Sequence, residues 1–240
     1  MTQLGDLKRL VRRAFDAAVA AGHPGEVTRA AMARLDSAPT AVIAVGKAAA
    51  SMAQAVRDSG CDAPGILVTT DESFAEVTGM TGFASAHPVP DDRGMQASAA
   101  VTDLVDGLGE GDHLLLLVSG GGSALLPAPA EGMGLADKQA LNEALLASGL
   151  DIHDMNAVRR LFSTLKGGRL ARRAAPAKVT QFLLSDVPGD RLESIASGPA
   201  IADPVPLETS LELIRAAGLN RLGFMPEQLR RIAAGEADLP

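Results

Sequence analysis

Short apolar runs, each separated from the next by a helix-favouring stretch, constrain the fold of this chain more than any other feature of its sequence. The runs cover residues 40–45 (TAVIAV), 65–70 (GILVTT), 112–118 (DHLLLLV) and 179–184 (VTQFLL). Strands that are buried on both faces of a parallel sheet have continuous apolar sequences of this kind. The pattern therefore predicts an α/β fold, a three-layer α/β/α Rossmann-like domain with a mostly parallel sheet.

Helices are predicted between and around these strands. Residues 4–21 place apolar side chains at helical spacing, with charged side chains mostly on the opposite face, which is typical of an amphipathic helix. The alanine-rich stretch that follows Gly46 also favours a helix. We expect helices over 4–21, 25–35, 47–57, 94–107, 135–147, 153–165, 207–217 and 226–234.

The composition excludes several classes of protein. Hydrophobic residues make up 47% of the 240 residues, which is enough for a core, so disorder is not expected. Aromatic residues make up only 2%, which argues against stacking platforms for single-stranded nucleic acid. The formal net charge of -7 opposes binding to a phosphate backbone, so any anion site is predicted to be local.

The sequence favours a soluble, cytoplasmic protein. Its N-terminal residues lack the continuous apolar run of a signal peptide, and the longest apolar run, residues 114–118, is too short to cross a membrane. The one cysteine, Cys61, excludes an internal disulfide and fits a reducing compartment. We expect its thiol to be buried or inert.

Four polar loops follow predicted strands, at residues 46–47, 69–71, 119–123 and 185–190. In an open parallel sheet such loops gather at the carboxyl edge, where ligands bind at a topological switch point. We therefore expect these loops to converge on one ligand site.

The loop Ser119-Gly120-Gly121-Gly122-Ser123, called the glycine loop below, is the strongest candidate for binding an anion. Its consecutive backbone N–H groups lack Cβ obstruction, so the chain can curl around an oxyanion between two hydroxyl groups. The alternative is a tight turn between a strand and a helix, but such a turn needs only one or two glycines.

Lys47 stands at the end of a predicted strand, where its ammonium can neutralise charge on a transferring phosphoryl group or orient an acid. A solvated lysine is the alternative on position alone. Neither common nucleotide loop fits the sequence. Ala41 and Ala48 replace the glycine and the hydroxyl residue that a Walker loop needs around Lys47, and the glycine loop does not continue as G-x-G-x-x-G.

Residues 151–170 concentrate charged side chains. On the helix predicted there, Asn156 shares a face with Arg159 and Arg160, and Lys166 follows further along the chain. A basic cluster beside the glycine loop suits a phosphorylated ligand. A solvated charged face is an equal alternative from the helix alone.

Asp186 and Asp190 flank a proline-glycine pair after the last predicted strand. Such a loop can hold Mg²⁺ through one or two carboxylates. Helix capping is the alternative, and it fits Asp190 better than Asp186. Asp186 is therefore the candidate metal ligand.

Several longer segments resemble the glycerate 2-kinases of the MOFRL type, within the hydroxypyruvate reductase/glycerate kinase-like family. The resemblance is carried by VGKAAASMA (45–53), HPVPD (87–91), SGGGSALLPAP (119–129), DKQALNEALLASGLDIHDMNAVRR (137–160), KGGRLA (166–171) and LSDVPGDRLESIASGPAIADP (184–204). The order and spacing of these segments also match, and they run through nearly all of the chain.

This resemblance implies a Mg²⁺-dependent transfer of the γ-phosphoryl group of ATP to the 2-hydroxyl of D-glycerate, in a cleft between an N-terminal and a C-terminal domain. It makes Lys47 the best catalytic candidate and assigns phosphate or carboxylate to the glycine loop. Asn156, Arg159, Lys166 and Asp186 are implied to line the cleft. The implied partners are ATP and D-glycerate, with no nucleic acid and no membrane, and a homo-oligomer stays open.

The chain also departs from the family pattern. Gly94 stands where a serine is expected after the proline turn, and Arg160-Leu161-Phe162 replaces a run that more usually resembles Lys-His-Leu. We expect residues 1–240 to be the N-terminal domain of a glycerate 2-kinase, with the C-terminal MOFRL domain missing from this chain. The alternative is a non-catalytic module that binds a nucleotide or a hydroxy acid.

Overall fold

A computed structural model describes residues 2–240 of the chain. Within them, one sheet contains β1 (Ala41–Val45), β2 (Gly65–Thr69), β3 (Met80–Ala84), β4 (His113–Val118) and β5 (Lys178–Leu183). The strand order is β3-β2-β1-β4-β5, and every neighbouring pair is parallel. The predicted α/β fold with a parallel sheet is therefore confirmed.

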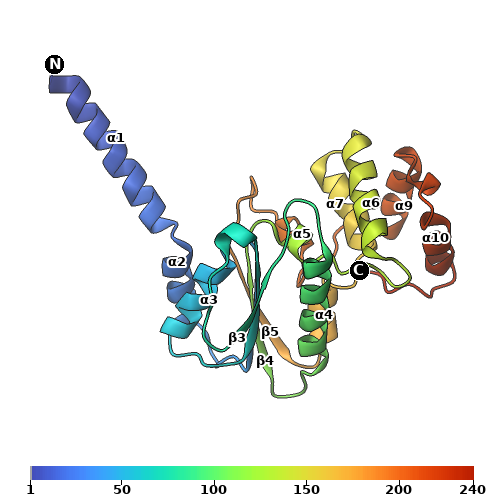
Figure 1. Ribbon diagram of the computed structural model, residues 1–240, viewed down its shortest axis with the longest axis horizontal. Coiled ribbons are helices and arrows are strands. Elements are labelled where there is room, and N and C mark those ends of the chain that lie inside the picture. Colours follow the sequence, from blue (N-terminus) through green and yellow to red (C-terminus); the bar gives the residue numbers. More distant parts are fainter. Residues whose placement is uncertain (1) are drawn as a thin grey trace.

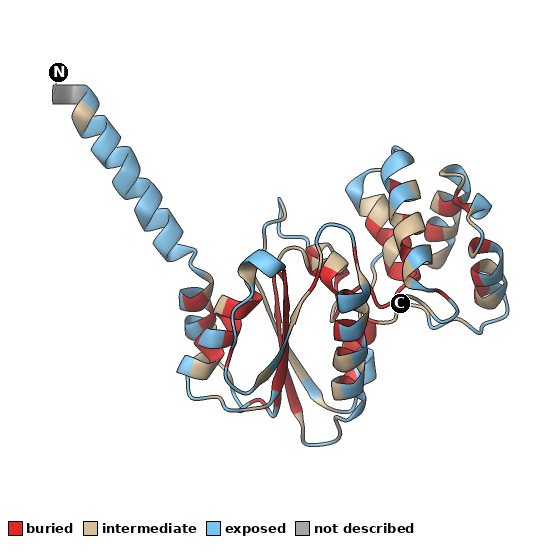
Figure 2. Ribbon diagram, viewed as in Figure 1, coloured by how far each residue is buried: buried red, intermediate tan, exposed pale blue. Residues whose placement is uncertain are grey.

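Helices cover both faces of the sheet (Figure 1). The two layers consist of α2 (Pro24–Met32) and α3 (Ala49–Asp58) on one face and α4 (Asp92–Asp106) and α8 (Arg169–Ala174) on the other. Alternate residues of β1 enter the two cores, so Ile43 packs on the α4 side and Val42 on the α3 side. The strands in the middle of the sheet are buried along their whole length (Figure 2).

Four helices in the second half of the chain form a bundle beside the sheet, next to α4 (Figure 1). They are α6 (Leu135–Ala147), α7 (Ile152–Leu161), α9 (Leu207–Ala216) and α10 (Met225–Ala233). Their apolar faces enclose a core of their own, which includes Leu141, Phe162 and Ile214. The sequence pattern predicts these helices as a continuation of the layers, but in the structure they cover one another instead of the sheet.

Two arginines connect the bundle to the rest of the molecule. The guanidinium of Arg160 on α7 lies 2.7 Å from the carboxylate of Asp203, and both side chains are almost fully buried. Arg169 on α8 donates hydrogen bonds of 2.7 and 3.3 Å to the carbonyl oxygens of Arg160 and Leu161 at the end of α7. These contacts hold α7 in place relative to the sheet.

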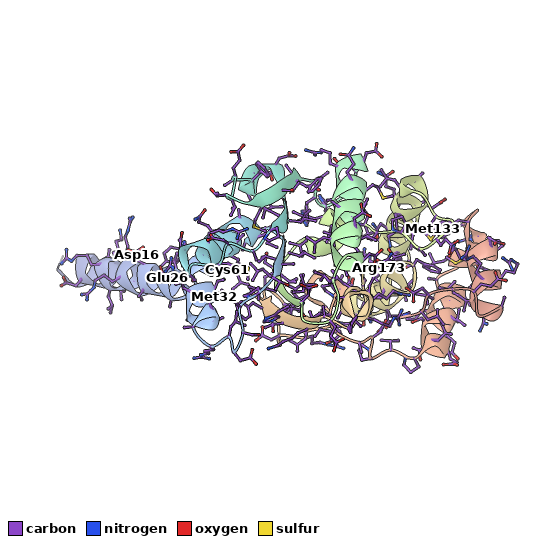
Figure 3. The ribbon with its side chains drawn as sticks, turned by 90° about the horizontal axis from the view of Figure 1, so that it is seen from below. Asp16, Glu26, Met32, Cys61, Met133 and Arg173 are labelled. Carbon is purple, nitrogen blue, oxygen red and sulfur yellow. The ribbon has the colours of Figure 1, made fainter. Side chains whose placement is uncertain are left out.

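The N-terminal helix α1 (Thr2–Ala21) projects away from the rest of the molecule (Figure 1). Its apolar side chains, Leu7 and Phe15 among them, are mostly exposed. Seen from below, α1 and the bundle lie at opposite ends, with the partly buried Cys61 between α1 and the centre and Met133 near the bundle (Figure 3). No helix in the described part of the chain has the length and apolar character needed to cross a membrane.

Most predicted helix and strand boundaries agree with the structure to within a few residues. The helix predicted over 153–165 ends at Leu161, because Phe162 leaves the helical conformation and packs into the bundle core. Strand β3 has no counterpart among the predicted strands, since its sequence MTGFA lacks a continuous apolar run and lies at the half-exposed edge of the sheet.

Candidate functional site

The chain reverses direction across the sheet between β1 and β4, which are neighbours in space but distant in sequence. This is the topological switch point, and the loops that follow the two strands lie side by side there. The N–H of Lys47 donates a 2.9 Å hydrogen bond to the carbonyl of Gly120, and the N–H of Ala48 donates a 3.0 Å bond to Ser119 Oγ. The expected convergence of these two loops is therefore observed.

Close backbone approach at this point requires glycine. Gly46 has a φ of +120°, and a Cβ atom there would lie 2.2 Å from Ser119 Oγ. A Cβ atom on Gly120 would lie 2.3 Å from Oδ2 of Asp186, so the exposed Asp186 carboxylate rests directly against the glycine loop. The loop after β5 thus reaches the same site as the loops after β1 and β4.

The glycine loop presents backbone donors. Gly121 has a φ of +90°, and the N–H groups of Gly121, Gly122 and Ser123 have no hydrogen-bond acceptor among residues 2–240. The short helix α5 (Gly122–Leu125) starts here. These N–H groups can therefore donate to an anionic ligand.

The two serine hydroxyls of the glycine loop are occupied by internal contacts. Ser119 is buried and its Oγ accepts from Ala48, as described above. Ser123 Oγ lies 2.7 Å from Oγ of Ser197. Ala196 has a φ of 50° and Ser197 a φ of 60°. Non-glycine residues rarely adopt these left-handed values, so the backbone that contacts Ser123 is strained. The hydroxyls thus stabilise the loop, and their role as groups that flank the anion stays a prediction.

The side chain of Lys47 lies over the glycine loop. A Cβ atom on Gly121 would lie 3.3 Å from Cγ of Lys47 and 3.3 Å from Cδ2 of His87, so the two side chains flank the same glycine. Burial and the charge of Lys47 together lower the pKa of His87. Within the described residues, no carboxylate lies within ion-pair distance of the Lys47 ammonium. That ammonium is exposed and available to a ligand.

A cavity of about 630 Å³ opens next to Lys47, between the glycine loop and the bundle. Its lining comes from the proline turn, the glycine loop and the segment that follows it, helices α6 and α7, and the chain just beyond α7. The residues are His87, Pro88, Val89, Pro90, Gly121, Ser123, Ala124, Pro127, Lys138, Gln139, Asn142, Glu143, Leu146, Arg159 and Lys166.

Three basic side chains line one part of this cavity. Lys138 and Lys166 are buried, and each ammonium donates to a main-chain carbonyl, that of Phe162 (2.9 Å) and that of Leu126 respectively. Arg159 donates to Oδ1 of Asn142 at 3.0 Å. Burial lowers the pKa of Lys166 to about 7, lowers that of Lys138 well below its usual range, and also lowers that of Arg159.

The predicted site residue Asn156 and its helix neighbour Arg160 do not line the cavity. Asn156 is buried and accepts a 3.2 Å hydrogen bond from Arg159, so it orients that arginine instead of lining the cavity. Arg160 was expected on the same face as Asn156 and Arg159. All three residues lie on α7, but the Arg160 guanidinium is held in its buried ion pair with Asp203 and does not line the cavity.

The loop after β2 contacts the segment that contains the proline turn at residues 87–91, and this turn lines the cavity. Asp71 forms two hydrogen bonds with Arg93, of 2.6 and 3.0 Å, and Arg93 also pairs with Asp91 at the end of the turn. Gln139 on α6 donates a 2.8 Å hydrogen bond to the carbonyl of Pro90. The predicted polar loop thus positions the turn that forms one wall of the cavity.

Gly94 differs from the serine expected at this position, and the structure gives the reason. A Cβ atom there would lie 3.0 Å from Cδ of Pro127 and 3.1 Å from the carbonyl oxygen of Leu125. Helix α4 therefore packs tightly against the segment that follows the glycine loop, which leaves little room for a side chain.

Lys138, Gln139 and Asn142 on α6 are among the cavity residues that the sequence did not predict as site residues. They lie in the predicted helix over 135–147, where polar side chains normally indicate a solvent-exposed face. The signal that points to them is their position within the long segment 137–160 that carries the family resemblance.

Comparisons with known proteins agree on one family. Residues 10–233 match the family described as "Domain of unknown function (DUF4147)". A candidate hydroxypyruvate reductase of Agrobacterium vitis is 39% identical over 97% of this chain and 53% of its own length. The D-glycerate 2-kinase of Thermotoga maritima is 38% identical over 89% of this chain and 52% of its own length.

A solved structure supports the same relationship. The crystal structure of a glycerate kinase (EC 2.7.1.31) from Thermotoga maritima matches with a TM-score of 0.88 and 37% identity, over 94% of this chain and 55% of that chain. The present chain therefore spans about half the length of the relatives it matches.

Proposed function

The chain belongs to the DUF4147 family, and we propose that its site serves the phosphorylation of D-glycerate by ATP at the 2-hydroxyl, giving 2-phosphoglycerate. The observation that carries the proposal is the fixed contact between the Lys47 loop and the glycine loop, beside a cavity with buried cations. The relatives named glycerate kinase add support. We further propose that residues 1–240 act as the N-terminal domain of a MOFRL-type glycerate 2-kinase.

Phosphoryl transfer depends mainly on positioning and on stabilising charge, so it suits a site made of backbone donors and cations. In this proposal Lys47 neutralises the charge that develops on the transferring group. The free N–H groups of the glycine loop bind anionic oxygens next to it. Arg159 and Lys166 bind further oxygens inside the cavity, and Asn156 orients Arg159.

The residues at the site also fit one Mg²⁺ ion. Asp186 provides an exposed carboxylate against Gly120, and residues 2–240 contain no cluster of three acidic, histidine or cysteine side chains that could form a complete metal site. Mg²⁺ commonly binds through one or two carboxylates together with substrate phosphates, so Asp186 would hold it with ATP. When bound, the ion would neutralise phosphate charge.

The relative described as a reductase raises a second activity, the reduction of hydroxypyruvate. Such a reaction needs a nicotinamide cofactor, and the dinucleotide fingerprint G-x-G-x-x-G normally follows the first strand. In this chain the sequence after β1 is Gly46-Lys47-Ala48-Ala49, which lacks the fingerprint. The kinase reaction is therefore the better supported of the two.

A coupled assay separates these activities. Purified protein is incubated with ATP, Mg²⁺ and D-glycerate while ADP release is followed, and in parallel with hydroxypyruvate and NADH or NADPH while nicotinamide absorbance is followed. The proposal predicts glycerate-dependent ADP release and no oxidation of the nicotinamide. Calorimetric binding of ATP or glycerate without ADP release would instead support the non-catalytic binding module.

A further inference from the structure

Lys138 and Lys166 are unusual because both side chains are buried in the wall of the cavity, with exposed fractions of 3%. The Lys138 ammonium donates to the carbonyl of Phe162, and the Lys166 ammonium donates to the carbonyl of Leu126. An ammonium group has three N–H donors, so each lysine has donors left over for a further acceptor.

The charges around the two lysines are mostly of the same sign. Arg159 from α7 and Arg169 from α8 are close enough to lower the pKa of both ammonium groups further. Within residues 2–240, no carboxylate lies within ion-pair distance of either lysine, and the acidic residue of the lining, Glu143, is exposed. Buried charges in proteins are normally paired, so a buried cationic cluster that faces a cavity indicates an anionic ligand.

We propose that Lys138 and Lys166, flanked by Arg159, form an oxyanion subsite in the buried wall of the cavity, which binds a carboxylate or phosphate group. The proposal deepens the proposed function and rests on it for the ligands, because D-glycerate supplies the carboxylate and ATP the phosphate. The subsite itself follows from the burial and the charge of the side chains. It assigns a binding role to Lys138 as well as to Lys166.

Anion binding at this subsite is coupled to proton uptake. Burial lowers the pKa of Lys166 to about 7 and lowers the pKa of Lys138 well below its usual range, so above pH 7 the amino group of Lys166 is largely neutral while the subsite is empty. A bound anion stabilises the charged ammonium and raises its pKa. The anion affinity is therefore expected to fall as the pH rises above 7, by up to about tenfold per pH unit for each proton taken up.

Three other ionisable groups around the cavity also have shifted pKa values, but they do not titrate in the same pH range. Arg159 and Arg169 remain charged, although burial lowers the pKa of Arg169 to about 10. His87 faces the cavity from the proline turn, and its lowered pKa keeps it neutral above pH 7. For D-glycerate, whose carboxylate stays charged in this range, a pH dependence of binding between pH 7 and pH 9 therefore reports on the two lysines.

Calorimetry on the 240-residue protein tests the proposal. D-Glycerate, whose carboxylate stays charged at both pH values, is titrated at pH 6 and pH 8, each in two buffers that differ in ionisation enthalpy. Inorganic phosphate, which itself gains a proton between pH 8 and pH 6, is titrated at pH 8 in the same two buffers. We expect binding of at least one anion, with an apparent enthalpy that depends on the buffer at pH 8. For D-glycerate this dependence is expected to be much weaker at pH 6. Preferred binding of glycerate identifies a carboxylate subsite, and preferred binding of phosphate identifies a nucleotide-phosphate subsite.

Lys138→Met and Lys166→Met keep the aliphatic chain and remove the charge, so both are expected to fold and to bind the anion at least tenfold more weakly. Lys8→Met, on the exposed helix α1, removes one charge outside the cavity and is expected to bind normally. Absence of anion binding, an affinity in both cavity variants equal to that of the unmodified protein, or a buffer-independent enthalpy at pH 8 in the unmodified protein would overturn the proposal.

ADP release measured on the same samples separates this inference from the proposed function. If anion binding depends on both lysines but no ADP is released, the proposed kinase reaction is contradicted and the proposed subsite is supported. Conversely, if ADP is released and both methionine variants bind the anion normally, the proposed subsite is contradicted and the proposed kinase reaction is supported.

Discussion

The backbone N–H of Lys47 donates a 2.9 Å hydrogen bond to the carbonyl oxygen of Gly120. This bond joins the loop after β1 to the loop after β4 at the switch point of the sheet. The backbone, and not the side chain, therefore fixes Lys47 above the glycine loop. The ammonium group can be removed without disturbing the loop that carries it.

Lys47→Met is expected to lower kcat for glycerate-dependent ADP release by about 100-fold or more, because it removes one preorganised charge from the transition state. The melting temperature is expected to stay the same, since the backbone bond to Gly120 remains. Steady-state kinetics and thermal unfolding measure the two effects. Lys178→Met, at the opposite end of the strands, serves as the control, and a kcat equal to that of this control would remove Lys47 from the mechanism.

Gly46→Ala tests the close approach of the two loops. The new Cβ atom would collide with Ser119 Oγ at a φ of +120°, so we expect the free energy of unfolding to fall by about 3 kcal/mol or more. Urea unfolding measures the change. At Gly223 a Cβ atom meets nothing within 4 Å, and Gly223→Ala is expected to be neutral. Equal stability of the two variants contradicts the predicted collision.

The buried pair of Arg160 and Asp203 is expected to hold the bundle in place. Asp203→Asn leaves the arginine charge buried without a partner and should lower the free energy of unfolding by about 3–5 kcal/mol. Adding Arg160→Met to the same protein should recover much of this loss, because no unpaired charge remains. A double-mutant cycle by urea unfolding measures the coupling, and additive effects would show that the two side chains do not interact.

The lowered pKa of Lys166 predicts that the free energy of unfolding depends on pH. Its pKa is about 7 in the folded protein and near 10.5 in the unfolded chain, so between these values the unfolded state binds one more proton. The contribution of Lys166 to the free energy of unfolding therefore rises with pH from 7 to about 10 and is lowest below pH 7. Lys166→Met should be more stable than the original protein at pH 6 to 7, and its advantage should shrink by pH 9. Urea unfolding at several pH values measures this difference, and a constant difference contradicts the lowered pKa.

The sequence alone predicts the parallel sheet because its central strands are buried on both faces, which leaves a continuous apolar signal in each one. The position of the glycine loop and of Lys47 follows from the same pattern, since both come directly after such strands. Strand β3 has no such signal, because it forms an edge of the sheet and is exposed to solvent on one side. Its sequence also contains Gly82, which packs against the ring of Phe74.

The buried cations could not be predicted from local sequence. Lys138 lies among polar residues in a helix, a pattern typical of a solvated face, and only the approach of the Phe162 carbonyl from the end of α7 shows that it is enclosed. Likewise Arg159 and Arg160 are neighbours in sequence, yet one faces the cavity and the other pairs with Asp203. These differences depend on how the bundle docks against the sheet, and no short-range pattern encodes that contact.

The most direct test of the proposed reaction is the identity of its product. Purified protein is incubated with ATP, Mg²⁺ and D-glycerate, and the phosphorus NMR spectrum is recorded over time. The proposal predicts that the signal of 2-phosphoglycerate grows in step with the signal of ADP, and that both depend on Lys47. Formation of 3-phosphoglycerate, or loss of ATP without any phosphoglycerate, would contradict it.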